Sequence, residues 1–310
     1  MTDSSAYITL DALLEVRRHC RELSLPGRSM HSSRQTGRQF SLLRGRGIDF
    51  DQVRLYQPGD DIRNIDWRVT ARTRKTHTKV FNEERERPVF VLCEQSSRMF
   101  FGTQRCFKSV LAAEASALIA WMALAHNDRI GGMVFDAEEC HEIRPRRSRQ
   151  AILQLLNRLL SGNNALQSGA PAAMTGEPLN LALRHSREVI RPGSILYLLC
   201  DHAAVDGLSQ PLLNALGAHN DLVLLPIYDP LEASLPSSPA LEFVQNQQRL
   251  TLNTTDTALR EVWATQFLTR QQAWHQLANR LRCSLQPLDT SRTPVEQLRL
   301  LLSTHARRRF

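Results

Sequence analysis

The feature that most constrains the fold is an alternation of short apolar runs with longer amphipathic segments, which starts at Val89 and continues to the C-terminal region. The apolar runs have the length of buried strands, and the segments between them have the length and spacing of helices. Strand and helix in regular turn predict an α/β fold, in which helices cover both faces of a mostly parallel sheet. The predicted strands are VFVLC, RIGGMVF, CHEIR, SILYLLC, DLVLLPI and 283–287, and the predicted helices are 104–126, 149–160, 177–187, 207–218, 258–280 and 294–307.

The N-terminal part of the chain has a different character. Apolar residues between positions 10 and 23 keep helical spacing, and a basic stretch rich in Ser, Gly and Arg follows from Arg28 to Arg46. A chain of 310 residues is long enough for two domains. We therefore expect a smaller N-terminal module over residues 1–88, formed by the helix and the segment after it, and an α/β domain over residues 89–310.

Composition points to a cytoplasmic protein. The most apolar stretch, 116–125, has about half the roughly 20 residues of a membrane-spanning helix, and the N-terminus lacks the pattern of a secretory signal. The six cysteines have no metal-ligand spacing, so we expect reduced thiols. We thus expect no transmembrane segment.

The chain is basic, with 39 Lys and Arg against 31 Asp and Glu, and only three of the cations are lysines. Arginine forks suit carboxylates and phosphates, although an arginine-rich genome would explain the same count. The stretch Arg28 to Arg46 and the run Arg307 to Arg309 could contact nucleic acid or an acidic membrane surface. No known nucleic-acid motif accompanies them, so nucleic acid is an unfavoured partner and peripheral membrane association stays open.

Candidate site residues follow two of the predicted strands. In parallel sheets, ligands bind at the carboxyl ends of the strands. Glu94, Ser96 and Arg98 follow VFVLC, and Asp201 and His202 follow SILYLLC. A lone histidine at such a place is more often a hydrogen-bonded neighbour than a catalytic base, and we expect that role for His202.

The segment 54–72 has its own pattern. Pro58 and Gly59 suit the central positions of a type II turn. Arginines alternate with aspartates after the turn, which predicts a structural ion-pair network around Trp67; paired carboxylates at 60 and 61 could alternatively serve acid/base chemistry or a metal. The network residues are Arg54, Tyr56, Pro58, Gly59, Asp60, Asp61, Arg63, Asp66, Trp67 and Arg72, and Arg68 is one of the arginines that alternate with the aspartates.

The run from Gly45 to Thr103, which contains YQPGDDIRNIDW, resembles the signature of the DUF58 family. The later blocks DRIGGMVF, LLCDH and IYDPLEASLP are similar to further blocks of that family in the same order. The resemblance implies a von Willebrand factor A-like domain with a Rossmann-like sheet, and an association with MoxR-type AAA+ ATPases.

The same resemblance implies a place for a metal-ion-dependent adhesion site. Such sites hold a divalent cation through a DxSxS loop, a Thr and a later Asp. Here Glu94 matches the first Asp, Ser96 the first Ser, Arg98 the second Ser and Asp201 the later Asp, while Thr175 is one choice for the Thr, with Glu177 or Pro178 as alternatives.

Arg98 changes what such a site can do. A guanidinium cannot coordinate a cation, so the resemblance implies a degenerate site without a divalent ion such as Mg²⁺. We expect Arg98 to pair with Glu94 or Asp201. In the alternative, Arg98 faces solvent and Glu94 caps the helix that begins near Gln104.

Enzyme motifs are missing from the sequence, with no GxxxxGK[ST], GxGxxG, HExxH or GxSxG. We expect a non-enzymatic protein-interaction module that acts as an adaptor or chaperone-like partner of a MoxR-type AAA+ ATPase, with a client protein and without a small-molecule substrate. Alternatives are a metal-dependent hydrolase using Asp60, Asp61, Glu94 and Asp201, or a weak binder of nucleic acid or acidic surfaces.

Overall fold

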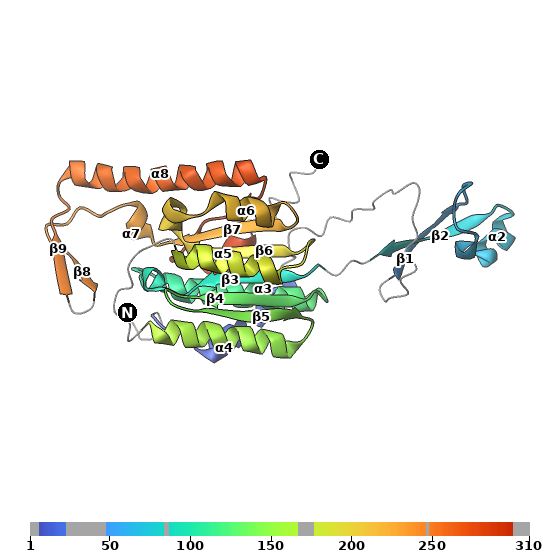
Figure 1. Cartoon of the computed structure of the whole chain (residues 1–310), viewed down its shortest axis with the longest axis horizontal. Coiled ribbons are helices and arrows are strands. Elements are labelled where there is room, and N and C mark those ends of the chain that lie inside the picture. Colours follow the sequence, from blue (N-terminus) through green and yellow to red (C-terminus); the bar gives the residue numbers. More distant parts are fainter. Residues whose placement is uncertain (1–5, 23–47, 84–86, 167–176, 246–247, 300–310) are drawn as a thin grey trace. The chain divides into compact units, whose positions relative to one another are not determined.

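The computed structural model describes residues 6–22, 48–83, 87–166, 177–245 and 248–299. The chain divides into two compact units (Figure 1). Residues 1–26 and 87–310 form the first, which we call the α/β unit, and residues 27–86 form the second, which we call the hairpin unit. Each unit is described by itself.

The α/β unit contains a seven-stranded sheet (Figure 1). The strand order is β10-β7-β6-β3-β4-β5, and β11 also pairs with β7. All pairs are parallel except that of β4 with β5, so the α/β fold with a mostly parallel sheet is confirmed. The strands are β3 (Val89–Glu94), β4 (Ile130–Phe135), β5 (Cys140–Arg146), β6 (Ile195–Asp201), β7 (Asp221–Tyr228), β10 (Ser284–Leu285) and β11 (Leu288–Asp289).

Helices cover both faces of this sheet. Alternate residues of β3 point to opposite faces, which is the strand period of two. Val89, Val91 and Cys93 pack in the core formed with α3 (Lys108–Ala125), α4 (Arg149–Ala165) and α1 (Leu10–Glu15). Phe90 and Leu92 pack in the second core, with α5 (Glu177–Val189), α6 (Gln210–Gly217) and α8 (Thr257–Leu281).

The first helix corrects the expected domain boundary. The helix α1 and the 3-10 segment η2 (Val16–Glu22) belong to the α/β unit and not to a module with residues up to 88. Leu13 is fully buried in the core of that unit, and Trp121 of α3 donates its Nε1–H to the Leu13 carbonyl over 3.2 Å. An amphipathic helix joins whichever core its apolar stripe can reach, and sequence order does not fix that choice.

Helix α3 is also long and apolar enough to cross a membrane by length and composition alone. Its most apolar window is 83% buried inside the fold, as expected for a core helix. Apart from the sheet, the α/β unit contains η4 (Ser97–Met99), η5 (His202–Gly207), α7 (Pro230–Ala233), helical residues 294–299, and a hairpin of β8 (Leu241–Gln245) and β9 (Gln248–Leu252) that the sequence patterns did not predict.

The hairpin unit consists of two antiparallel strands, β1 (Ile48–Leu55) and β2 (His77–Glu83), with η3 (Ile62–Asn64) and α2 (Trp67–Thr73) in the connection between them. Asp60 donates its backbone N–H to the Gln57 carbonyl over 3.0 Å, and Gly59 has φ of 107°. These are the features of the type II turn that Pro58 and Gly59 predict, because the third position of that turn requires positive φ.

Candidate functional site

Carboxylates follow three neighbouring strands at the carboxyl edge of the sheet. Glu94 ends β3, Asp201 ends β6, and Asp229 comes directly after β7. All three are buried. Parallel strands deliver their carboxyl ends to one edge, which is why residues more than a hundred positions apart in sequence meet there.

Glu94 connects the first two strands. Its Oε1 accepts a hydrogen bond from the Ser96 hydroxyl over 2.5 Å, and its Oε2 accepts one from the Asp201 backbone N–H over 2.9 Å. The structure therefore brings Glu94, Ser96 and Asp201 together. Burial raises the pKa of Glu94, and the charge of Asp201 raises it further, against the hydrogen bonds it accepts and the weaker opposing effect of Arg98.

The cation in this site is Lys108, the first residue of α3. Its Nζ donates to Asp201 Oδ2 over 2.5 Å and to Glu232 Oε1 over 2.6 Å, and only 2% of its side chain is exposed. Burial disfavours the charge, but the two carboxylates outweigh it and raise the pKa of Lys108. A fixed ammonium thus neutralises the carboxylates of Asp201 and Glu232.

Helix α7 supplies the second carboxylate. Asp229 and Glu232 form a capping box, in which Glu232 Oε2 accepts the Asp229 backbone N–H over 2.8 Å. Asp229 in turn accepts from the hydroxyls of Thr103 and Thr290, both over 2.5 Å. Burial raises the pKa of Glu232, and Lys108 opposes that rise. Each carboxylate is therefore held by at least one further element of the fold.

Arg98 lies half-buried in η4, and its charge acts on Glu94, one of its two predicted partners. The other predicted partner, Asp201, forms its ion pair with Lys108. Glu94 does not cap α3, since that helix begins after Phe107. Thr175 lies outside the described residues. Within the described ranges, no group of three or more His, Cys, Asp and Glu side chains could hold a metal ion.

His202 is held by stacking and not by the hydrogen bond we expected. Its ring lies 4.5 Å from the Phe267 ring and 5.8 Å from the Tyr228 ring, centroid to centroid. Its Nε2 is buried and has no hydrogen-bond partner in the described part of the chain. Burial lowers the pKa of His202 to about 4, so the imidazole is neutral near pH 7.

The predicted network in the hairpin unit exists as separate local contacts. Asp60 accepts from Arg54 over 2.6 Å and from the Gln57 backbone N–H over 2.9 Å. Asp61 caps η3, and Asp66 caps α2.

Trp67 is not the centre of that network, because 66% of its surface is exposed. Arg63, Arg68 and Arg72 are exposed as well, and Tyr56 is half-buried. Trp67 begins the two-turn helix α2, and the two strands of the hairpin unit form a single layer. That layer does not cover the indole ring.

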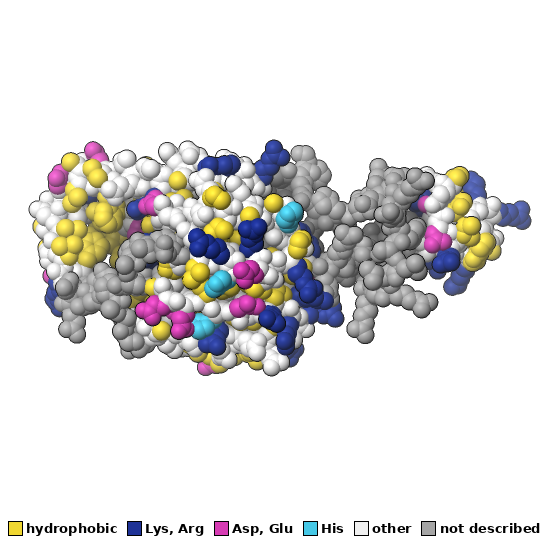
Figure 2. All heavy atoms as spheres, in the orientation of Figure 1, with side chains coloured by type: hydrophobic (Ala, Val, Ile, Leu, Met, Phe, Trp, Pro, Cys, Tyr) yellow, Lys and Arg dark blue, Asp and Glu magenta, His cyan; other side chains and the backbone are white. Residues whose placement is uncertain are grey.

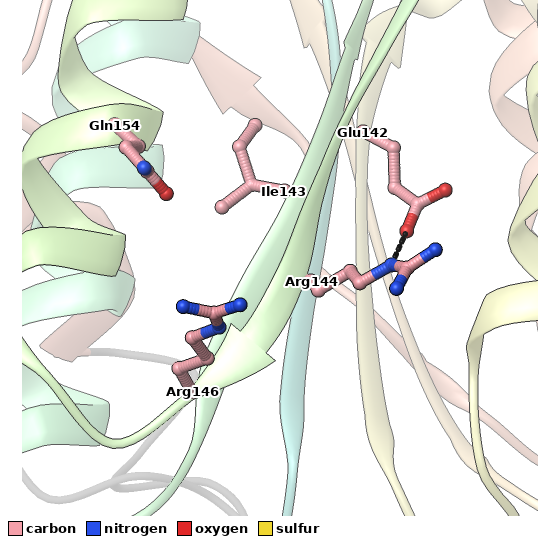
Figure 3. A pocket seen from close by; sticks show the side chains of 5 residues that line it. All are labelled: Glu142, Ile143, Arg144, Arg146 and Gln154. Carbon is pink, nitrogen blue, oxygen red and sulfur yellow. Dashed lines mark hydrogen bonds and ion pairs between the residues drawn. The ribbon is translucent and has the colours of Figure 1, made fainter.

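A shallow pocket lies elsewhere on the α/β unit, along the edge strand β5 and helix α4 (Figure 3). Figure 3 shows the Arg144 guanidinium directed to the Glu142 carboxylate, and the N–O distance of this pair is 3.3 Å. No predicted site residue lines this pocket, whose lining residues are Glu142, Ile143, Arg144, Arg146 and Gln154.

Comparison with known proteins identifies the family. Residues 52–273 match the family described as "Protein of unknown function DUF58". The chain belongs to the DUF58 family. Curated relatives of this DUF58 chain include the uncharacterized proteins Rv1480 of Mycobacterium tuberculosis and Mb1516 of Mycobacterium bovis, each 29% identical over 200 residues. Those 200 residues are 64% of this chain and 61% of each relative.

Two solved structures are similar to parts of the DUF58 chain. BatB from Bacteroides thetaiotaomicron matches 71% of this chain and 98% of its own, with 15% identity and a TM-score of 0.41. A von Willebrand factor type A protein from Catenulispora acidiphila matches 75% of this chain and 44% of its own, with 10% identity and a TM-score of 0.36.

Proposed function

We propose that this DUF58 chain is a non-enzymatic protein-interaction module, and that it acts as an adaptor or chaperone-like partner of a MoxR-type AAA+ ATPase. Membership of the family and the α/β fold support an interaction module in general. The MoxR-type partner comes from the sequence resemblance.

The observation that carries the proposal is that Lys108 lies between Asp201 and Glu232 at the carboxyl edge of the sheet, which we call the carboxyl-edge site. A metal ion can bind a partner only where one of its coordination positions is not filled by a ligand from its own chain. Metal-dependent hydrolysis needs the same kind of position, because it holds the reacting water. The Lys108 ammonium instead bonds to Asp201 and Glu232 at 2.5 and 2.6 Å, deep in the fold. A carboxyl-edge site filled by an ammonium in this way favours a binding edge that works without a metal ion.

Beside the carboxyl-edge site we propose that Arg98 contacts an acidic group of the partner. A guanidinium has five N–H donors in a planar fork, so it can keep a contact within the chain and still grip a carboxylate. Its position in η4, directly after β3, puts it on the loop side of the sheet, where A-type domains meet their partners by our analogy.

The hydrolase alternative is less well supported because its acids have partners. Asp60 is bound by Arg54, Asp61 caps η3, and Asp201 is bound by Lys108. The basic stretches that would serve a nucleic-acid binder, Arg28 to Arg46 and Arg307 to Arg309, lie outside the described residues. We therefore keep the interaction module, located in the cytoplasm and without a small-molecule substrate, as the proposal.

The test is a pull-down of a purified MoxR-type ATPase by the full chain, with and without ATP. We expect capture by the wild type, strong loss with Arg98→Glu, and no loss with Arg144→Glu. Arg144 is the matched control because it is an arginine of the same unit whose side chain is 82% exposed on the edge strand β5. No capture by the folded wild type would refute the ATPase partnership, and equal capture by both variants would refute the contact through Arg98.

A further inference from the structure

The hairpin unit exposes three large apolar side chains at one end. Leu55 is 52% exposed, Ile62 is 65% exposed and Trp67 is 66% exposed. The ladder of the unit begins where Ile48 pairs with Glu83, and Leu55 pairs with His77 at its opposite end. The three side chains therefore belong to the connection end, away from the Ile48–Glu83 pair.

Cations surround these apolar residues in the sequence and on the surface. Arg63, Arg68, Arg72, Arg74 and Lys75 are all exposed. Within the described part of the chain, no carboxylate lies within ion-pair distance of these five side chains, since Asp60 pairs with Arg54 and Asp66 with Lys79. Figure 2 shows yellow hydrophobic side chains gathered on this unit with dark blue Lys and Arg beside them. We call this surface the basic-apolar tip, made of Leu55, Ile62, Trp67 and these five cations.

The described part of the hairpin unit does not bury these side chains in a core. Over residues 53–79, Thr78 is the single buried residue, so this part of the unit has almost no core of its own. Two strands with one short helix are marginally stable in water. Over the same residues the sequence carries seven Lys and Arg against three Asp, and the aspartates are used in caps, turns and pairs. The tip thus presents apolar groups and positive charge together.

We propose that the basic-apolar tip docks on an anionic lipid surface. Interfacial segments place Trp and aliphatic side chains at the boundary of the acyl chains and arginines or lysines among anionic headgroups. Projecting side chains, each more than half exposed, suit insertion into a fluid interface. Nucleic acid would pair with the cations, but it would not bury the projecting side chains of Leu55 and Ile62. An acidic protein is the competing partner, and the test below distinguishes it from a lipid surface.

The experiment measures co-sedimentation of the full chain with vesicles of phosphatidylcholine alone or of phosphatidylcholine with phosphatidylglycerol. We expect binding to the anionic vesicles only, with a blue shift of tryptophan emission. Trp67 is the most exposed of the four tryptophans, so the shift should vanish in Trp67→Phe while binding largely remains. Neutralising two charges, in Arg68→Gln with Arg72→Gln, should weaken binding by about 25-fold, at roughly fivefold for each charge.

The matched control is Leu250→Ser, which removes an apolar side chain that is 57% exposed in the α/β unit. It should bind the vesicles as the wild type does, whereas Ile62→Ser should bind them less. Equal binding to neutral and anionic vesicles, or equal loss in Leu250→Ser, would overturn the proposal. Binding of soluble polyglutamate at the tip, without any sedimentation with vesicles, would assign the surface to an acidic protein instead.

Discussion

Replacing Lys108 by methionine tests how much the buried ion pairs contribute to stability. The side chain is 2% exposed and bonds to two carboxylates, so Lys108→Met leaves Asp201 and Glu232 without their cation. Removing one partner of a buried ion pair costs about 3–5 kcal/mol, because the remaining charge stays out of water. We expect urea unfolding, followed by circular dichroism at neutral pH, to show a loss of that size, which is a large share of the ~5–15 kcal/mol of a typical fold.

The loss should depend on pH with a definite sign. The pKa of Glu232 is already raised by burial, and without Lys108 it rises further. A carboxyl whose pKa is higher in the folded state stabilises the fold when protonated, so this contribution is lost as pH increases. The deficit of Lys108→Met should therefore grow from acidic to mildly basic pH.

Two further variants of the same site make this reasoning refutable. Lys79→Met is the matched control, because the Lys79 side chain is 41% exposed and its Nζ lies 3.8 Å from Asp66. Such a pair is screened by water and contributes little to stability. Adding Asp201→Asn and Glu232→Gln to Lys108→Met should recover most of the lost stability, since no buried charge is then stranded. A loss in Lys108→Met no larger than that in Lys79→Met would refute the account of the ion pairs.

Three other predictions concern single residues. The raised pKa of Glu94 makes its protonated form the stabilising one, so the wild type should lose stability as pH rises above about 4.5. Glu94→Gln should remove this loss. Urea unfolding of both proteins from pH 5 to pH 8 measures the difference. His202→Phe should remove the loss of stability below pH 6.5, since the lowered pKa of about 4 means that folding requires the neutral ring, and the stack on Phe267 can persist; thermal melts across that range would disprove this if the two curves stay parallel. Asp66→Ala should speed amide exchange in α2 because it removes the N-cap, whereas Trp67→Ala should change stability by less than ~0.5 kcal/mol, and a large loss in the second variant would show that the exposed ring is in fact packed.

Sequence patterns predict the α/β architecture well because strand and helix periods are local properties. The continuous apolar runs at Val89–Glu94 and Ile195–Asp201 are buried along their whole length, which two-sided coverage by helices requires. The helix predicted over 258–280 is α8. The sequence patterns do not predict the hairpin of β8 and β9, because its apolar residues are few and interrupted by polar ones. The sequence patterns do not predict that α1 belongs to the α/β unit, because this placement depends on contacts with a helix about a hundred residues away.

The candidate site was predicted only in part. Glu94, Ser96 and Asp201 meet because strand ends meet, which topology predicts. Lys108 and Glu232 could not be found by matching loop positions, since both come from helices beside the carboxyl edge of the sheet. One signal was present, however: only three lysines stand among 39 cations, and one of them opens the most apolar helix of the chain. A compact ammonium fits a small ion site better than a guanidinium fork, so a lysine that stands out in this way is worth testing first.

The most direct test of the central claim, that Lys108 takes the place of a divalent cation, is the melting temperature of the full chain in EDTA and in excess Mg²⁺ or Mn²⁺. Binding at hundredfold excess over the dissociation constant would stabilise the fold by ~2.7 kcal/mol, which is several degrees for a chain of this size. We predict identical melting temperatures in all three solutions, because the ammonium of Lys108 already neutralises Asp201 and Glu232. A rise of several degrees with either metal, abolished by Asp201→Asn, would contradict the claim.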